Sequence, residues 1–378
     1  MSGIEADLAA AVPGAAAHHG LAPALRAVPA SRRLSLLERM PKWLICVPLT
    51  VQWLWLSLRY LSATLPSAAN PALTSGGLVG EGKLEYFQSM GLLASAATAR
   101  YFSVFTDGKP SDAQLRRQMV ARSMQFPLIA KPDLGLCGYG VRRIDDLAAL
   151  QAYLAAFPRN ESVVLQQYLP QEGEAGIFYV RDPRTDGARI ISLTLRYFPR
   201  VTGDGHSTVA ELVAADPRAR RGALPGRHEV HADLRRVPAA AEVVRLATIG
   251  STRVGGLYRD GAAFITPQLT AAIDAIARDM PQFHFGRFDV RFESLRDLAA
   301  GKGFMIMEVN GAGSEAIQAW DPDTGLLAGL RMIFEKQRIL FEIGDAMRRK
   351  GFKPIGVMAL ARLNSRQNRL VAQYPPSN

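Results

Sequence analysis

Two apolar segments of the sequence carry oxygen-bearing side chains at their centres. The segment GRFDVRF contains Asp289, and the segment GFMIMEVNG contains Glu308 and Asn310. Successive side chains of a strand point to opposite faces, so Arg287 and Asp289 share a face of the first segment, as do Glu308 and Asn310 of the second. The connection between the segments is short enough for a hairpin. That hairpin would bring the three oxygen-bearing groups together beside an arginine.

Two carboxylates and an amide carbonyl are ligands that suit a hard cation such as Mg²⁺. Buried carboxylates without partners are costly, so a metal ion or the neighbouring arginines must compensate their charge. The alternative is a solvated sheet face with ordinary Arg–Asp pairs. These two segments alone leave both interpretations open.

A glycine-rich segment, FPLIAKPDLGLCGYGV, has the residue types of a phosphate-binding loop. A strand delivers Lys131, and the loop that follows contains Gly135, Gly138 and Gly140. Glycines let backbone N–H groups approach phosphate oxygens, and the lysine adds a positive charge. A plain turn after a strand explains the same glycines, so the segment is not specific by itself.

Two further segments contain groups that can recognise parts of a nucleotide. A strand ends at Gln166–Gln167, where backbone edges would bind adenine, and the carboxylate of Glu174 would accept from a ribose diol. A β-turn with exposed acids is the alternative. The segment GDGHSTVAEL predicts a helix capped by Ser207 or Thr208, whose N-terminus would bind an anion.

A framework of strands and helices has to position these residues. From about residue 125, short β-type runs alternate with helical patterns. Strands are expected over residues 127–130, 162–168, 176–180, 188–198, 286–292 and 303–311. Helices are expected from near Gly82, over 143–157 with Asp145 as the cap, and over 324–351. The pattern predicts an α+β fold with mostly antiparallel sheet.

Composition restricts the classes of function. The 378 residues are 48% hydrophobic and 21% charged, as in ordinary globular proteins, and the net charge of +11 favours acidic partners. Cys46 and Cys137 are too few and too far apart for a disulfide scaffold, and the histidines show no zinc-ligand spacing. Nucleic-acid binding is disfavoured, because the basic residues are dispersed and no aromatic–basic platform is present.

The N-terminal part has a different character. Residues 1–40 are expected to form a disordered arm without a signal peptide, and residues 41–66 to form an apolar segment. The uncharged run at 43–58 would span roughly 24 Å as a helix, less than the ~30 Å hydrocarbon core of a bilayer. Two interpretations stay open for it. One is a buried strand and helix broken at Pro48; the other is peripheral membrane contact through residues 32–59.

Taken in order, the motifs resemble the ATP-grasp superfamily. They are most similar to its carboxylate–amine ligases, such as D-alanine–D-alanine ligase and the ATP-grasp half of cyanophycin synthetase. The resemblance covers about residues 80–345. It rests on GEGKLEYF with Lys83, then IAKPDLGLCGYGV, QQYL, GDGHSTVAEL, GRFDV and MEVNG. It implies two α+β subdomains that clasp ATP between antiparallel sheets, preceded by an N-terminal apolar, helical extension.

The resemblance also implies roles for individual residues. Adenine would lie at the hinge 166–169 and the ribose at Glu174, and Arg287 and Lys83 would act in catalysis. Mg²⁺, with Mn²⁺ as an alternative, would be held by Asp289, Glu308 and Asn310. The residues expected to bind ATP are Lys83, Lys131, Gly135, Gly138, Gly140, Gln167, Tyr168, Leu169 and Glu174.

The implied reaction is the activation of a small-molecule carboxylate as an acyl phosphate, followed by attack of an amine. The alternatives are a phosphotransferase of the same fold and a nucleotide-binding protein without turnover. The reaction implies a cytoplasmic location, at the inner face of the membrane if residues 32–59 make that contact. Neither the two substrates nor the oligomeric state follows from the sequence.

The expected domain organisation follows these motifs. Residues 67–120 precede the ATP-grasp part, 121–190 form its small subdomain, 191–350 its catalytic subdomain and 351–378 a C-terminal tail. The sequence departs from the D-alanine ligases after Asn310, where GAGSEAIQAW replaces their Thr/Ser-Pro-Gly loop. A substrate other than D-alanine is therefore expected.

Overall fold

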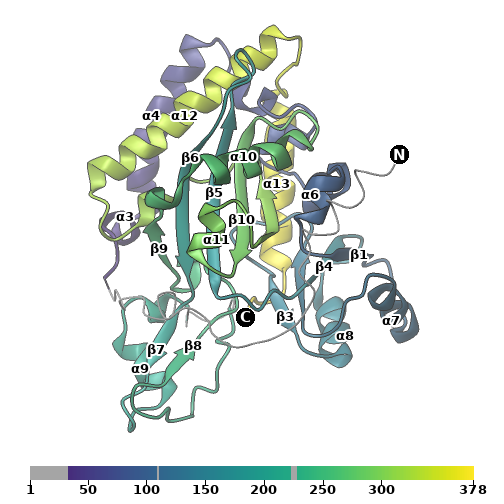
Figure 1. Cartoon of the computed structure of the whole chain (residues 1–378), viewed down its shortest axis with the longest axis vertical. Helices are drawn as coiled ribbons and strands as arrows, with labels where there is room; N and C mark the ends of the chain where they lie inside the picture. The colour runs from purple at the N-terminus through teal and green to yellow at the C-terminus, as the bar shows by residue number, and fades with distance from the viewer. Residues whose placement is uncertain (1–32, 109, 223–227) are drawn as a thin grey trace.

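The computed structural model describes residues 33–108, 110–222 and 228–378, and its main feature is a pair of antiparallel sheets (Figure 1). The large sheet has the order β11-β10-β5-β6-β9 and the small sheet the order β1-β4-β2-β3; β7 and β8 form a separate ribbon. This confirms the predicted α+β class with antiparallel sheets. The strands are β1 (Tyr101–Phe105), β2 (Leu128–Pro132), β3 (Arg142–Ile144), β4 (Ser162–Gln167), β5 (Gly173–Arg181), β6 (Ala188–Tyr197), β7 (Arg200–Thr202), β8 (Val243–Arg245), β9 (Leu257–Asp260), β10 (Phe285–Phe292) and β11 (Phe304–Asn310).

The predicted hairpin of β10 and β11 is confirmed. Arg287 is paired with Asn310 and Asp289 with Glu308, and the register shifts after Asp289. The connection contains a short helix, α11 (Leu295–Ala299). The pairing places the acidic and amide side chains opposite one another on one face of the sheet.

The two faces of β10 differ because its side chains alternate. Phe288, Val290 and Phe292 are buried in the main core, beneath α10 (Pro267–Arg278). On the other face, Phe285 is covered by the long helix α12 (Leu326–Arg349), whereas Arg287, Asp289 and Arg291 line a cavity. The sheet thus supplies an apolar foundation on one side and a polar floor on the other.

The small sheet is built in the same way. Leu128 and Ala130 of β2 pack under α7 (Asp112–Ala121) and α8 (Leu147–Ala156), while Ile129 and Lys131 face the cavity. The cap of α8 is Asp146, whose carboxylate accepts from the Ala149 N–H at 2.8 Å, so the prediction of Asp145 was wrong by one residue. Asp145 instead pairs with Arg143 at 2.8 Å.

The N-terminal segment is more ordered than predicted where the structure describes it. Residues 1–32 of the expected arm lie outside the described residues, but α3 (Leu36–Arg39) begins with a capping box between Ser35 and Glu38. The next element, α4 (Lys42–Arg59), is one helix that includes Pro48, so the predicted break at this proline was wrong. Packing against α12 offsets the backbone hydrogen bond that a proline removes. No helix in the described part of the chain is long and apolar enough to cross a membrane.

The predicted C-terminal tail is mostly helical. The helix α13 (Val357–Gln373) runs between the two sheets in the view of Figure 1. Its Gln367 donates to the Gly135 carbonyl at 2.8 Å and accepts from the Gly80 N–H at 3.2 Å, and Tyr374 donates to the Leu134 carbonyl at 2.6 Å. This helix is therefore part of the cavity wall.

Shorter helices complete the fold. As predicted, one begins directly after Gly82. They are α5 (Lys83–Ser89), α6 (Leu92–Ala96), α9 (Val209–Ala215), η2 (Leu65–Ala68), η3 (Thr74–Gly77), η4 (Ala219–Arg221), η5 (Thr252–Val254), η6 (Ala262–Phe264) and η7 (Ile317–Trp320).

Candidate active site

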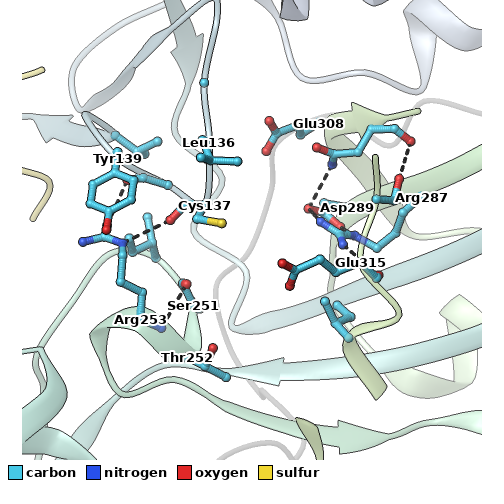
Figure 2. Close-up of a pocket in the computed structure, with 18 of the residues that line it drawn as sticks. Leu136, Cys137, Tyr139, Ser251, Thr252, Arg253, Arg287, Asp289, Glu308 and Glu315 are labelled. Atoms are coloured by element: carbon cyan, nitrogen blue, oxygen red, sulfur yellow. Dashed lines mark hydrogen bonds and ion pairs between the residues drawn. The ribbon is translucent and has the colours of Figure 1, made fainter. Parts of the chain in front are cut away.

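A cavity of about 930 Å³ lies between the large and the small sheet. Figure 2 shows the glycine-rich loop with Leu136, Cys137 and Tyr139 on one side, and Arg287, Asp289 and Glu308 across from it. The lining includes every residue predicted to bind ATP except Gly140, and all three predicted metal ligands. Segments more than 200 residues apart in the sequence therefore meet in one space.

Asp289 is buried at the centre of the polar floor and is paired with two arginines. Its Oδ1 lies 2.6 Å from Arg287 Nε, and its Oδ2 lies 3.0 Å from Arg287 Nη2 and 3.1 Å from Arg196 Nη1. Asn310 Nδ2 donates to the same Oδ2 at 3.4 Å. Asn310 and Asp289 are thus in contact, as the hairpin predicts, and the Arg–Asp pair of the alternative interpretation is present as well.

Glu308 faces the cavity beside two lysines. Its Oε1 lies 3.2 Å from the Lys83 ammonium. Burial acts to raise the pKa of Glu308, but the charges of Lys83 and Lys131 lower it to about 2. The side chain is therefore ionised, and about a third of it is exposed to the cavity.

The donors fit a hard divalent cation in chemical type. Asp289 and Glu308 supply carboxylate oxygens, and Asn310 can supply an amide oxygen, which are the ligands that Mg²⁺ prefers. Among the described residues no group of three or more His, Cys, Asp or Glu side chains is arranged to hold a metal. A cation bound here would therefore need the Asn310 amide as its third protein ligand. Arg287 and Arg196 now hold the Asp289 oxygens, and one of these pairs has to loosen when a cation binds.

Lys131 connects the two sheets across the cavity. Its ammonium, on β2, donates to Gln166 Oε1 of β4 and to the Met307 carbonyl of β11, both at 2.7 Å. Burial lowers the pKa of Lys131 to about 7, and the nearby Lys83 acts in the same direction. A bound polyphosphate would favour its charged form.

The loop after Lys131 contains several residues with a left-handed backbone. Cys137, Gly138 and Gly140 all have positive φ angles, of 48°, 73° and 72°. Arg253 clamps this loop: its Nε donates to the Cys137 carbonyl and its Nη2 to the Gly138 carbonyl, both at 3.1 Å. The arginine also lies 4.2 Å from the centroid of the Tyr139 ring.

Gly135, in the same loop, lies against the side chain of Lys83. A Cβ at this position would collide with the Lys83 ammonium. The missing side chain therefore makes the space in which Lys83 reaches Glu308.

The predicted adenine hinge lies at the end of β4. Gln166, Gln167, Tyr168 and Leu169 all line the cavity. The Gln167 N–H donates to the Arg100 carbonyl at 2.8 Å, so this backbone donor is committed to β1. The assignment of adenine to this hinge stays a prediction.

Glu174 lies in the cavity wall but differs from a free ribose acceptor. Its Oε1 is 3.1 Å from Arg196 Nε and its Oε2 is 3.3 Å from Arg291 Nη2, and the side chain is 4% exposed. Arg196 pairs with both Glu174 and Asp289. The residue predicted to bind ribose and one predicted to bind the metal therefore belong to one network of ion pairs. Its role toward ribose stays a prediction.

The GDGHSTVAEL segment folds as predicted but lies elsewhere. Thr208 caps α9, with Glu211 completing the capping box. The carboxylate of Asp204 accepts the N–H groups of His206 and Ser207 at 3.0 and 2.7 Å, so a side chain of the loop already occupies these donors. This segment does not contribute to the lining of the cavity.

Several residues of the site were not predicted. Arg291 could have been predicted, because it shares a strand face with Asp289. Glu315 also lines the cavity and lies in the loop after Asn310, whose sequence differs from that of the D-alanine ligases. Burial raises the pKa of Glu81, another lining residue, to about 7. The contribution of α13 had no signal in the sequence, because it follows the last motif. Its lining residues are Asn364, Gln367, Asn368, Val371 and Ala372.

No family model and no curated protein matches the sequence. The chain is similar to a bifunctional glutathione synthetase from Pasteurella multocida, with 17% identity over 71% of this chain and 38% of that chain and a TM-score of 0.36. It is also similar to a D-alanine–D-alanine ligase from Bacillus anthracis, with 14% identity over 64% of this chain and 62% of that chain and a TM-score of 0.33. A third similar structure is a D-cycloserine synthetase, with 14% identity over 67% of this chain and 70% of that chain and a TM-score of 0.37.

This chain therefore spans less than two thirds of the length of the first two proteins. The second is of the kind that the sequence motifs resemble. Because all these TM-scores are below 0.5, the interpretation of the site depends on its own residues and distances.

Proposed function

We propose that the protein is an ATP-dependent carboxylate–amine ligase with the ATP-grasp fold. ATP would lie between the small and the large sheet, and the products would be an amide, ADP and phosphate. A small-molecule acid and a small-molecule amine are the proposed substrates, and the cytoplasm is the proposed location.

One observation carries this proposal: cations from one side of the cavity meet an acidic and amide cluster from the other. Lys83 and Lys131 approach Glu308 and the end of β11 beside the buried Asp289. A cavity with lysines on one wall and carboxylates opposite matches the charge pattern of a polyphosphate chelated by a divalent cation. The glycine-rich loop, held by Arg253, forms a third wall, and its backbone N–H groups would add further donors for the phosphates.

The proposed mechanism assigns a task to each of these groups. Lys131 and the loop bind the phosphates, and Lys83 neutralises charge beside the transferred group. Arg287, with its guanidinium at the cavity floor, stabilises the transferred phosphoryl group and then the oxyanion formed when the amine attacks. Asp289, Glu308 and Asn310 would hold Mg²⁺, which supplies charge neutralisation on the phosphate oxygens. Positioning and electrostatics supply the catalysis, so no nucleophilic side chain is needed.

ADP release in the presence of pooled carboxylates and hydroxylamine tests the proposal. Hydroxylamine converts an acyl phosphate to a hydroxamate, so carboxylate-dependent ADP release with hydroxamate formation is expected. A stable phosphorylated product without hydroxamate would indicate the phosphotransferase instead.

A second candidate function has its own supporting observation. Both oxygens of Asp289 are paired with arginines, which is also how a nucleotide-binding protein without turnover would neutralise this position. Saturable ATP binding with no ADP release against any carboxylate pool would favour that candidate.

A further inference from the structure

The helix α4 has apolar side chains on two opposite sides. One side packs on the body of the protein: Ile45 and Leu56 are buried, Leu49 and Trp53 pack beside them, and Gln52 donates to the Phe334 carbonyl of α12 at 2.9 Å. The spacing of these residues is that of one helical stripe. An ordinary surface helix would be polar on the opposite side.

On α4 the opposite side is apolar as well. The residues form a second stripe and are largely exposed: Trp43 (68%), Val47 (52%), Val51 (62%), Leu54 (57%), Trp55 (53%) and Leu58 (75%). Leu61, just beyond the helix, is 89% exposed. An apolar patch that is continuous along a whole helix is unusual on a soluble monomer and marks an interaction surface.

The charged residues of α4 and of the segments that flank it in the sequence are basic. No Asp or Glu occurs between residues 40 and 80. Arg39 ends α3, three residues before α4, and Arg59 is the last residue of α4. Both arginines are exposed, and the Arg59 guanidinium lies 5.5 Å from the Trp55 ring centroid and 5.8 Å from that of Tyr60. An apolar stripe with basic ends and exposed tryptophans has the composition of a helix that lies in the headgroup region of an anionic bilayer.

We propose that the exposed face of α4 binds the surface of an anionic lipid bilayer, with the helix axis parallel to the membrane plane. The tryptophans would lie at the headgroup level and the leucines and valines would enter the acyl boundary. The arginines would contact lipid phosphates. The catalytic cavity, on the inner side of α4, would remain in water.

Charge favours this occupant over a second copy of the chain. A twofold axis that packs α4 on α4 brings a basic end against a basic end, whether the helices run parallel or antiparallel. No carboxylate on α4 compensates that repulsion. Anionic lipid headgroups supply the missing negative charge.

Co-sedimentation of the full-length protein with vesicles tests the proposal. The probes are vesicles of phosphatidylcholine alone and of phosphatidylcholine with about a third phosphatidylglycerol. We expect binding to the anionic vesicles, weakened by salt, and a blue shift of tryptophan emission. Arg59→Gln should lower the partition coefficient about fivefold, since a basic residue at an anionic surface contributes about 1 kcal/mol.

The apolar contribution is separated by a matched pair of variants. Val51→Glu should lower vesicle binding at least tenfold, whereas Val120→Glu, on a still more exposed position of α7 (78%), should leave it unchanged. Circular dichroism and nucleotide binding should be the same in all three proteins, because these side chains are exposed. The readout is independent of the proposed ligase activity.

Two outcomes would overturn the proposal. If the wild-type protein does not bind anionic vesicles at low salt, a lipid bilayer is not the partner of α4. A wild-type dimer by light scattering that Val51→Glu converts to a monomer, together with no vesicle binding, would show instead that α4 covers a second copy.

Discussion

The Lys83 ammonium lies 3.2 Å from a carboxylate oxygen of Glu308, although the two residues are 225 positions apart in the sequence. Lys83 begins α5 and Glu308 lies near the end of β11, so their contact joins the N-terminal region to the large sheet at the wall of the cavity. The pair holds Glu308 ionised and keeps a cation beside the position proposed for the phosphates. In the proposed ligase this contact would keep a positive charge beside the phosphates and a carboxylate ready for the divalent cation.

Replacing Glu308 with Gln should abolish Mg²⁺-dependent ATP turnover. The amide retains the size of the side chain but loses the charge that a divalent cation requires. The melting temperature should change little, because the side chain is partly exposed to the cavity. Glu293→Gln, at an exposed position after β10, is the matched control and should keep full activity. Normal Mg²⁺ dependence in Glu308→Gln would remove this residue from the metal site.

Replacing Lys131 with Ala should weaken ATP binding by roughly 1.5–3 kcal/mol, the range for a hydrogen bond to a charged group. The lysine is 4% exposed and already lies between the two sheets, so its charge acts at short range. Titration calorimetry measures the affinity. Lys302→Ala, on an exposed turn before β11, serves as the control for removal of one positive charge. Equal affinities for the two variants would contradict a phosphate contact by Lys131.

ATP binding should take up protons at pH 8. Burial lowers the pKa of Lys131 to about 7, so at pH 8 the lysine is mostly neutral in the free protein. Bound phosphates favour the ammonium form and raise this pKa. ATP affinity should therefore fall as the pH rises above 7, by up to about tenfold per unit. Calorimetry in buffers with different ionisation enthalpies measures the uptake, which should vanish in Lys131→Ala; an unchanged uptake in that variant would assign it to another group.

Replacing Gly135 with Ala should impair turnover more than stability. The new Cβ would collide with the Lys83 ammonium, the mobile end of a flexible side chain, which can move away at little cost. The movement breaks the contact with Glu308. Activity should fall at least tenfold while the melting temperature stays within a few degrees. Gly187→Ala is the control, because its new Cβ would meet only the Thr185 hydroxyl, at 3.2 Å and far from Lys83. A fully active Gly135→Ala protein would mean that the Lys83 position is not needed.

The part of the site that the sequence predicted is the part determined by local patterns. Alternation along β10 and β11, with a short connection, is sufficient to bring Asp289, Glu308 and Asn310 to one face of a hairpin, and a strand followed by glycines is sufficient to place Lys131 before its loop. The exact pairing of Asp289 with Glu308 did not follow from the alternation. Of the two arginines that pair with Asp289, only Arg196 was not predictable. Arg287 lies on the same strand, but Arg196 arrives from β6, and alternation along one strand cannot tell which distant charge will lie alongside.

The N-terminal helix shows a different limit. Pro48 predicts a break from its local chemistry, yet α4 continues through it because long-range packing of Ile45 and Leu56 holds both halves. The described part of the predicted arm is ordered for a similar reason: Arg218 and Arg221, distant in the sequence, pair with the buried Glu38 at 2.8 and 3.0 Å.

The position of α13 has a consequence for biosynthesis. The glycine-rich loop is made early, but Gln367, Tyr374 and Asn378, which fasten it at Gly135, Leu134 and Val141, are made more than 200 residues later. Both sheets can leave the ribosome and pair before this helix exists. During that interval Arg253 can hold the loop at Cys137 and Gly138, but the hydrogen bonds at Leu134, Gly135 and Val141 are still missing. The wall of the cavity is therefore completed only after both sheets can form.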